Sequence, residues 1–257
     1  TVNKMCGSGM KSTMIGFNQI AIGQSNLMAV GGMESMSNAP FILPKMRSGV
    51  RLGHAEVKDH MFFDGLEDAY DKGRLMGTFA EDCAEKYQFT RQAQDEYALK
   101  SLSNALCAEK NGVFDNEIAP YIITTPKGNR TITADEQPAN ARPEKIPHLK
   151  PAFRKDGTVT PANSSSISDG AAALILTSQD YAAKNDLTVR AKIMGHASHA
   201  QEPRWFATAP IPAAQKLLDR IGGKKEDVDL WEVNEAFAVV PMAFMRDMDI
   251  RRDKINI

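Results

Sequence analysis

A cysteine flanked by small residues stands almost at the start of the chain, in VNKMCGSGM, residues 2–10. We predict that Cys6 lies where a strand over residues 2–5 ends and a helix over residues 8–22 begins, with Gly7 and Gly9 permitting a sharp turn. A thiol at a helix N-terminus lies near the positive end of the helix dipole, which favours the thiolate. Backbone N–H groups at such a turn can also stabilise an oxyanion. Cys6 is therefore a candidate nucleophile, and a buried structural thiol is the alternative that these residues leave open.

The chain has two further cysteines, Cys83 and Cys107. Three is an odd number, and their spacing fits neither a disulfide framework nor a zinc site. Cys83 shares a predicted helix face with Ala80, Ala84 and Tyr87, so we expect it in the core. Cys107 lies near the end of another predicted helix, where packing is also the expected role. Thiols without partners indicate a reducing compartment, with the cytoplasm as the default.

Two polar stretches could also do chemistry. Asn234, in WEVNEAF (231–237), is predicted at a strand-to-helix junction, either as an ordinary N-cap or as an amide that positions a water or a carbonyl. The hydroxyl-rich NSSSISDG (163–170) precedes an apolar run and is either a turn or a source of hydrogen bonds to the amides of a ligand.

Strands and helices must alternate to position these residues. Residues 27–30 read as a buried strand that stops at Gly31-Gly32, and residues 171–177 as a second buried strand. We expect a helix from Ser178, a strand over 189–194, a helix over 212–221 that ends at Gly222-Gly223, a strand over 228–233, and a last helix opened by Asn234. The pattern is that of an α/β protein.

A long irregular segment interrupts this pattern. Within it, Thr78 and Glu81 suggest a capping box that opens a helix through Tyr87, and Thr90 is the predicted cap of a helix that runs to about Lys110. Short strands are expected over 115–162, with a hairpin at residues 155–158 and a proline-rich connection over 138–151.

Composition limits the class of protein. The 257 residues are 42% hydrophobic and 25% charged with a net charge of -1, which is typical of a soluble globular protein and gives no reason to expect a nucleic acid or a membrane as partner. No apolar run reaches the 18 residues or so of a membrane span. Residues 121–157 carry seven Lys/Arg against four Asp/Glu, which suits either a phosphorylated ligand or an ordinary solvated surface.

Four motifs together resemble the thiolase family, the acetyl-CoA acetyltransferases and 3-ketoacyl-CoA thiolases. They are VNKMCGSG (2–9), GGMESMS (31–37), GTVTPANSSSISDGAAAL (157–174) and VNEAFA (233–238), in family order over essentially the whole chain. The resemblance implies an acyltransferase in which a cysteine takes the acyl group of an acyl-CoA as a thioester, and a second acetyl-CoA attacks it as a carbanion. Thiolysis of a 3-ketoacyl-CoA is the reverse. It also implies no metal and no tightly bound cofactor, with acetyl-CoA, acyl-CoA and coenzyme A as partners, and a homodimer or homotetramer.

The resemblance assigns roles residue by residue. Cys6 matches the nucleophile, and Asn234 the asparagine that holds a water of the oxyanion hole. Ser165 matches a serine that bonds the pantetheine arm, and Arg142 is a candidate contact for adenine or phosphate. The apolar positions around the arm and the acyl tunnel are matched by Leu66, Met76, Phe153, Ala236 and Phe237.

The implied fold has two similar α/β halves, each with a five-stranded mixed sheet in layers with helices, plus an inserted loop domain. Residues 1–36 and 168–187 would form part of the N-terminal half, and 188–257 part of the C-terminal half. Residues 37–167 would form the loop domain that covers CoA. Both halves are expected to be incomplete.

Two family motifs do not occur in these residues, the GHP motif whose histidine activates the nucleophile and the CxGGG motif of the second cysteine. The expectation is an internal piece of a thiolase, inactive by itself, from the cytoplasm or from a mitochondrion or peroxisome. The alternatives are a non-catalytic thiolase-like protein that binds acyl-CoA or lipid, and another condensing enzyme such as a ketoacyl synthase.

Overall fold

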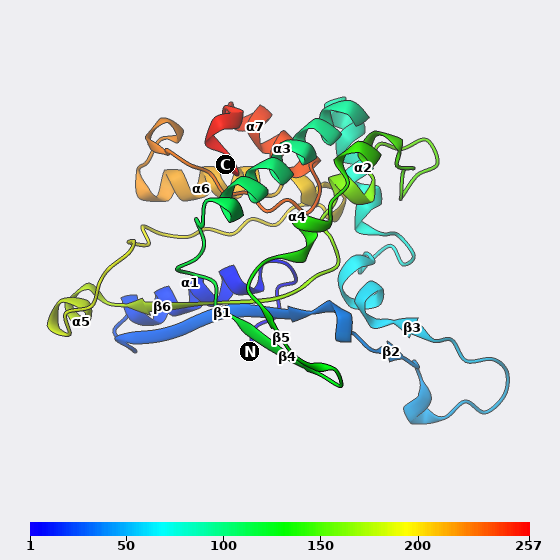
Figure 1. Ribbon diagram of the computed structural model, residues 1–257, viewed down its shortest axis with the longest axis horizontal. Helices are drawn as coiled ribbons and strands as arrows, with labels where there is room; N and C mark the ends of the chain where they lie inside the picture. The colour runs from blue at the N-terminus through cyan, green and yellow to red at the C-terminus, as the bar shows by residue number, and fades with distance from the viewer. The chain divides into compact units, whose positions relative to one another are not determined.

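The computed structural model describes all 257 residues, and the chain divides into two compact units (Figure 1). Unit 1 consists of Thr1–Met76, Ile167–Ser198 and Asp219–Gly222. Unit 2 consists of Gly77–Ser166, His199–Leu218 and Gly223–Ile257. None of the helices is both long and apolar enough to cross a lipid bilayer.

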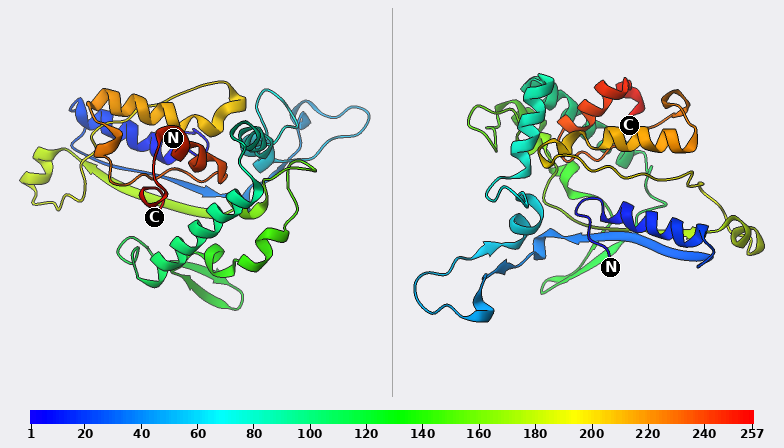
Figure 2. Two further views of the ribbon diagram at one scale, coloured as in Figure 1. Left: turned by 90° about the horizontal axis from the view of Figure 1, so that it is seen from above. Right: turned by 180° about the vertical axis from the view of Figure 1, so that it is seen from behind.

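Unit 1 is built on a two-stranded antiparallel ribbon with a helix against it (Figure 2). Strand β1 (Leu27–Ser35) pairs with β6 (Asp169–Thr177) along their whole length, with Leu27 opposite Thr177. Helix α1 (Ser8–Ala21) packs on the ribbon through Gly16, where a Cβ atom would come within 2.6 Å of Val30 Cγ1. The smaller elements of unit 1 are β2 (Phe41–Ile42), β3 (Lys58–Asp59), α5 (Gln179–Lys184), the 3-10 helices Met36–Asn38 and Met46–Ser48, and the π-helix Phe62–Leu66.

Unit 2 is mainly helical and holds most of the buried apolar side chains. Its helices are α2 (Met76–Tyr87), α3 (Arg91–Lys110), α4 (Glu136–Asn140), α6 (Pro210–Ile221) and α7 (Val239–Met248). The first residue of α2 and the last three of α6 are grouped with unit 1. A hairpin of β4 (Tyr121–Thr125) and β5 (Gly128–Ile132) and five 3-10 helices complete the unit: Pro143–His148, Pro161–Asn163, Pro203–Thr208, Lys225–Asp227 and Arg252–Lys254. Phe79, Val159, Phe244 and Ile255 lie in its core, each at most 2% exposed.

Helices whose signals are local are confirmed. Thr90 caps α3, where its hydroxyl accepts from Ala93 N, and Ser178 caps α5 in the same way from Tyr181 N. Helix α6 ends at Ile221, and Gly222 follows with a φ of 67°, a left-handed conformation that glycine adopts freely.

Three predicted strands are wrong, those over 2–5, 189–194 and 228–233. The backbone there forms no ladder, and only isolated bridges link Lys4 with Cys6 and Trp231 with Ile255. A segment becomes a strand only where a partner strand takes up its N–H and C=O groups, and none of these three segments belongs to a sheet.

Four details of the other elements also differ. Strand β1 runs through Gly31 and Gly32 instead of ending there, because its pairing with β6 continues to Ser35. Glycine at position 31 fits this close pairing, since a Cβ atom there would come within 2.2 Å of Ala172 O on β6. Strand β6 is exposed along Asp169–Ala173 and beyond, not buried, because it pairs with a single strand. Helix α7 begins at Val239, so Asn234 is not its N-cap. Cys107 is exposed and is not a packing residue.

The capping box at Thr78 and the hairpin at 155–158 are wrong for one shared reason. Helix α2 already begins at Met76, so the Glu81 side chain is free of the helix terminus. Its carboxylate instead accepts the backbone N–H groups of Thr158 (2.9 Å) and Val159 (2.9 Å). These N–H groups are therefore taken up by a buried carboxylate and not by a neighbouring strand.

Candidate active site

Cys6 lies on a tight turn directly before α1, and it is exposed. The preceding residue, Met5, has a φ of 48°, in the left-handed region that residues other than glycine rarely adopt. Gly7 N donates to Lys4 O (3.0 Å) and Ser8 N donates to Met5 O (3.1 Å), which closes the turn. A strained turn that presents a side chain at a helix start is the arrangement used by nucleophile elbows. The structure thus confirms that Cys6 lies at a helix start, although no strand leads into the turn.

Helix α1 is fixed to β1 close to this turn. Ser12 Oγ lies 2.7 Å from Gly31 O and accepts from Gly31 N at 3.0 Å. A Cβ atom on Gly32 would come within 3.0 Å of Gly9 Cα, so glycine at both positions lets helix and strand approach closely. The first turn of α1 therefore has a defined place on the ribbon of unit 1.

The other two thiols have different surroundings. Cys83 is fully buried in α2, and burial raises the pKa of its thiol from 9.0 to about 12. Cys107 is exposed in the last turns of α3, with its sulfur 3.3 Å from Asn111 Nδ2. Only Cys6 combines exposure with a turn at a helix N-terminus.

In unit 2 the structure brings four of the predicted site residues together. Ser165 N donates to Ala236 O at 3.0 Å, and Ser165 Oγ donates to the backbone oxygen of Glu235. The ring of Phe237 meets that of Phe153 edge-on, with centroids 6.0 Å apart. The hydroxyl-rich stretch and the NEAF stretch are therefore neighbours in the fold, which neither stretch shows alone.

Glu235 fixes the segment that carries Asn234, and it was not among the predicted site residues. Its Oε1 accepts from Tyr97 Oη (2.7 Å) and from Asn256 Nδ2 (2.8 Å), and its Oε2 accepts from Ser101 Oγ (2.6 Å). Burial, followed by the hydrogen bond to Glu235, raises the pKa of Tyr97 well above its usual value, so this phenol stays a donor. Asn234 itself is exposed, on a loop whose next residue is held by three donors.

The remaining predicted residues are more scattered. Leu66 ends the π-helix of unit 1, and Met76, also in unit 1, begins α2; both are half-buried. Arg142 is exposed in unit 2, directly before the 3-10 helix Pro143–His148. The structure places Arg142 in no cluster with the other predicted residues.

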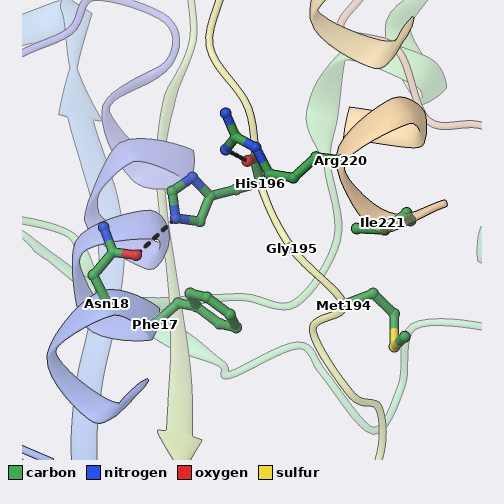
Figure 3. A pocket seen from close by; sticks show the side chains of 7 residues that line it. All are labelled: Phe17, Asn18, Met194, Gly195, His196, Arg220 and Ile221. Carbon is green, nitrogen blue, oxygen red and sulfur yellow. Dashed lines mark hydrogen bonds between the residues drawn. The ribbon is translucent and has the colours of Figure 1, made fainter. Parts of the chain in front are cut away.

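A half-open pocket of about 430 Å³ in unit 1 contains none of the predicted site residues (Figure 3). His196 Nε2 lies 2.9 Å from Asn18 Oδ1, and Arg220 Nη1 donates to His196 O at 2.6 Å. The Phe17 ring meets the imidazole edge-on at 5.5 Å. These contacts satisfy the polar atoms that they join, and none of them involves Cys6.

Comparisons with known proteins decide the family. A model of the thiolase N-terminal domain matches residues 1–180, and a model of the thiolase C-terminal domain matches residues 187–257. This chain belongs to the thiolase family. It is 45% identical to a probable acetyl-CoA acetyltransferase of Dictyostelium discoideum and 44% identical to acetyl-CoA acetyltransferase 2 of Arabidopsis thaliana, in both cases over 100% of this chain. It covers 62% and 64% of these relatives, respectively.

Solved structures confirm the thiolase fold. The chain matches the crystal structure of the Bacillus anthracis acetyl-CoA acetyltransferase with a TM-score of 0.95 at 39% identity. It matches that of the Acat5 thiolase from Ascaris suum, in complex with coenzyme A, with a TM-score of 0.93 at 38% identity. Each match covers 100% of this chain and 65% of the other. The predicted α/β class and the resemblance drawn from the four motifs are both confirmed.

Proposed function

We propose that this chain is part of an acyltransferase of thiolase type, with Cys6 as the nucleophile. The enzyme would condense two acetyl-CoA molecules to acetoacetyl-CoA, or cleave a 3-ketoacyl-CoA with CoA. The observation that carries the proposal is the exposed thiol of Cys6 on a strained turn at the start of α1, in a chain that matches both thiolase domains. The relatives named as acetyl-CoA acetyltransferases support acetyl as the transferred group.

The first half-reaction starts from the thiolate of Cys6 and, unlike the second, forms no carbanion. It attacks the carbonyl carbon of acetyl-CoA, and the bond between that carbon and the CoA sulfur breaks as the new thioester forms. The CoA thiolate leaves and takes a proton from solvent. The backbone N–H groups at the start of α1 follow Cys6 directly in the sequence, and they are the proposed donors to the developing oxyanion.

The second half-reaction removes a proton from the methyl group of another acetyl-CoA, and the carbanion displaces Cys6 from the acetyl carbon. That step needs a positioned acid and base, a role worth typically 10²–10⁴-fold per group. The 257 residues contain neither the GHP motif, whose histidine activates the nucleophile in the family, nor the CxGGG motif, whose cysteine serves there as acid and base. We therefore assign no residue of this chain to these roles.

The remaining site residues are proposed to bind CoA. Ser165 would donate a hydrogen bond to the pantetheine arm or accept one from it, and Asn234 would hold a water. The apolar positions around the arm and the acyl group would be Leu66, Met76, Phe153, Ala236 and Phe237. Residues 37–167 would form the loop domain that covers CoA, with Arg142 near the adenine or a phosphate. The N-terminal half would consist of residues 1–36 and 168–187, and the C-terminal half of residues 188–257. The coenzyme A complex of the Ascaris suum thiolase supports a ligand of this class. A homodimer or homotetramer is part of the same proposal.

Alkylation of the three cysteines by iodoacetamide tests the role of Cys6. The folded chain is labelled with and without acetyl-CoA, and each cysteine peptide is followed by mass spectrometry. We expect Cys6 to react fastest and to be slowed by acetyl-CoA, while exposed Cys107 serves as the internal standard and buried Cys83 stays unlabelled. Equal rates at Cys6 and Cys107, or no slowing of Cys6 by acetyl-CoA, would contradict the proposal.

A further inference from the structure

We infer that Ser8 is a positioning residue, whose hydroxyl holds the strained turn that presents Cys6. Its importance for catalysis rests on the function proposed above. Its effect on the Cys6 thiol is a separate matter and can be measured without any CoA ligand.

The Ser8 hydroxyl bonds to both residues that precede Cys6 in the turn. Ser8 Oγ donates to Met5 O at 2.7 Å and accepts from Lys4 N at 2.8 Å. One hydroxyl carries a single hydrogen, so these two bonds use its one donor and one of its acceptor positions. The side chain therefore reaches back over Cys6 and Gly7 and joins the two ends of the turn.

The backbone at Met5 explains why such a tie is needed. A methionine at a φ of 48° is strained, and a residue in that region stays there only where its surroundings hold it. Besides Ser8 Oγ, three bonds act on this turn: Gly7 N to Lys4 O (3.0 Å), Ser8 N to Met5 O (3.1 Å) and Met5 N to Asn3 Oδ1 (3.0 Å). The Ser8 hydroxyl is the contact that engages both Lys4 and Met5.

Loss of the hydroxyl would leave Met5 O with one backbone donor and Lys4 N without its acceptor. Met5 could then relax toward a negative φ, and the Cys6 side chain would turn away from the N–H groups that begin α1. The reactivity of the Cys6 thiol therefore depends on Ser8, although the serine side chain need not touch a substrate.

The test is the rate of Cys6 alkylation in Ser8→Ala and Ser8→Thr, measured without CoA and relative to Cys107 in the same molecule. We expect Ser8→Ala to slow Cys6 roughly 2- to 10-fold, the factor that corresponds to one ordinary hydrogen bond, and Ser8→Thr to restore the rate. Thr13→Val is the matched control, because Thr13 Oγ1 donates to Gly9 O on the same helix but does not bond the turn. It should leave the rate unchanged.

A second variant separates relief of strain from general loosening of the fold. Glycine adopts a positive φ without strain, so Met5→Gly should make the turn independent of the serine. Ser8→Ala added to Met5→Gly should then slow Cys6 much less than it does in the parent chain. An equal slowing in both backgrounds, a Thr variant as slow as the Ala variant, or an unchanged rate in Ser8→Ala would overturn the inference. Failure of acetyl transfer to Cys6 would count against the proposed function and leave this result as it stands.

Discussion

Replacing Glu235 is expected to destabilise unit 2 and to release the loop that carries Asn234. Three donors from distant parts of the chain, Tyr97, Ser101 and Asn256, converge on its carboxylate at 2.6–2.8 Å. Glu235→Ala leaves all three without this acceptor. Tyr97 is the most affected, because it is only 6% exposed and its hydroxyl cannot turn to solvent easily.

The size of the effect follows from the charge and the exposure of the pair. A hydrogen bond to a charged group contributes about 1.5–3 kcal/mol, and leaving a buried donor unpaired costs about 1–3 kcal/mol. Because Glu235 is half-buried, water can replace part of what is lost. We expect Glu235→Ala to lower the free energy of unfolding by roughly 2–4 kcal/mol and Tyr97→Phe by roughly 1–2 kcal/mol. The double variant should lose less than the sum, by about 1 kcal/mol.

Urea unfolding followed by tryptophan fluorescence reports this unit alone, since both tryptophans of the chain, Trp205 and Trp231, belong to unit 2. Glu232→Gln is the matched control, because Glu232 is an exposed carboxylate of the same segment and its replacement should change stability by less than about 0.5 kcal/mol. A Glu235→Ala variant as stable as the control, or strict additivity with Tyr97→Phe, would refute the idea that this network fixes the loop.

Three further expectations concern the pH dependence of the two units and the binding of CoA. Burial raises the pKa of Cys83 to about 12, so its contribution to the stability of unit 2 is complete below pH 9.0 and is lost as the pH rises toward 12. Urea midpoints of Cys83→Ala over that range should lack this loss, and parallel pH curves for variant and parent would contradict it. The hydroxyl and amide of Ser37 hold the pKa of Asp169 below 3.8, so this pair stabilises unit 1 above that pH and the contribution is lost as the pH falls through the folded value. An NMR titration of the Asp169 carboxyl carbon should show this and should shift toward the ordinary value in Ser37→Ala; an ordinary value in the parent would refute it. Reversing exposed charges in the basic segment, residues 121–157, should weaken CoA binding by about 1 kcal/mol or less per residue, and by less at high salt. Calorimetry measures this affinity, and an unchanged value would show that the phosphates bind elsewhere. The residues are Lys127, Arg142 and Lys145.

Elements that depend on nearby residues could be predicted from the sequence. Thr90 and Ser178 cap their helices through side chains that bond within three residues, and Gly16 marks the contact of α1 with β1. The position of Cys6 just before a helix could be predicted for the same reason, because a turn at a helix start depends on adjacent residues.

Features that depend on distant partners could not be predicted. The bond of Tyr97 to Glu235 joins residues 138 positions apart, and the buried Glu81 accepts N–H groups 77 and 78 positions away. Segments such as 189–194, in which apolar residues alternate with Arg190 and Lys192, look like strands in sequence, but only pairing makes them so. Ser8 is a local partner of the Cys6 turn, yet a serine at a helix start has many ordinary reasons to be there, and its bonds to Met5 and Lys4 become visible only in three dimensions.

The most direct test of Cys6 as the nucleophile is the acetyl group itself. The chain is incubated with acetyl-CoA, freed of excess ligand, digested, and examined for the mass of one acetyl group on each cysteine peptide. We predict an acetyl thioester on the peptide of Cys6, removed again by added CoA and absent from Cys6→Ala, because the first half-reaction starts from the Cys6 thiolate and forms no carbanion. An unmodified Cys6, or an acetyl group carried equally by Cys107, would contradict the assignment of Cys6 as the residue that accepts the acyl group.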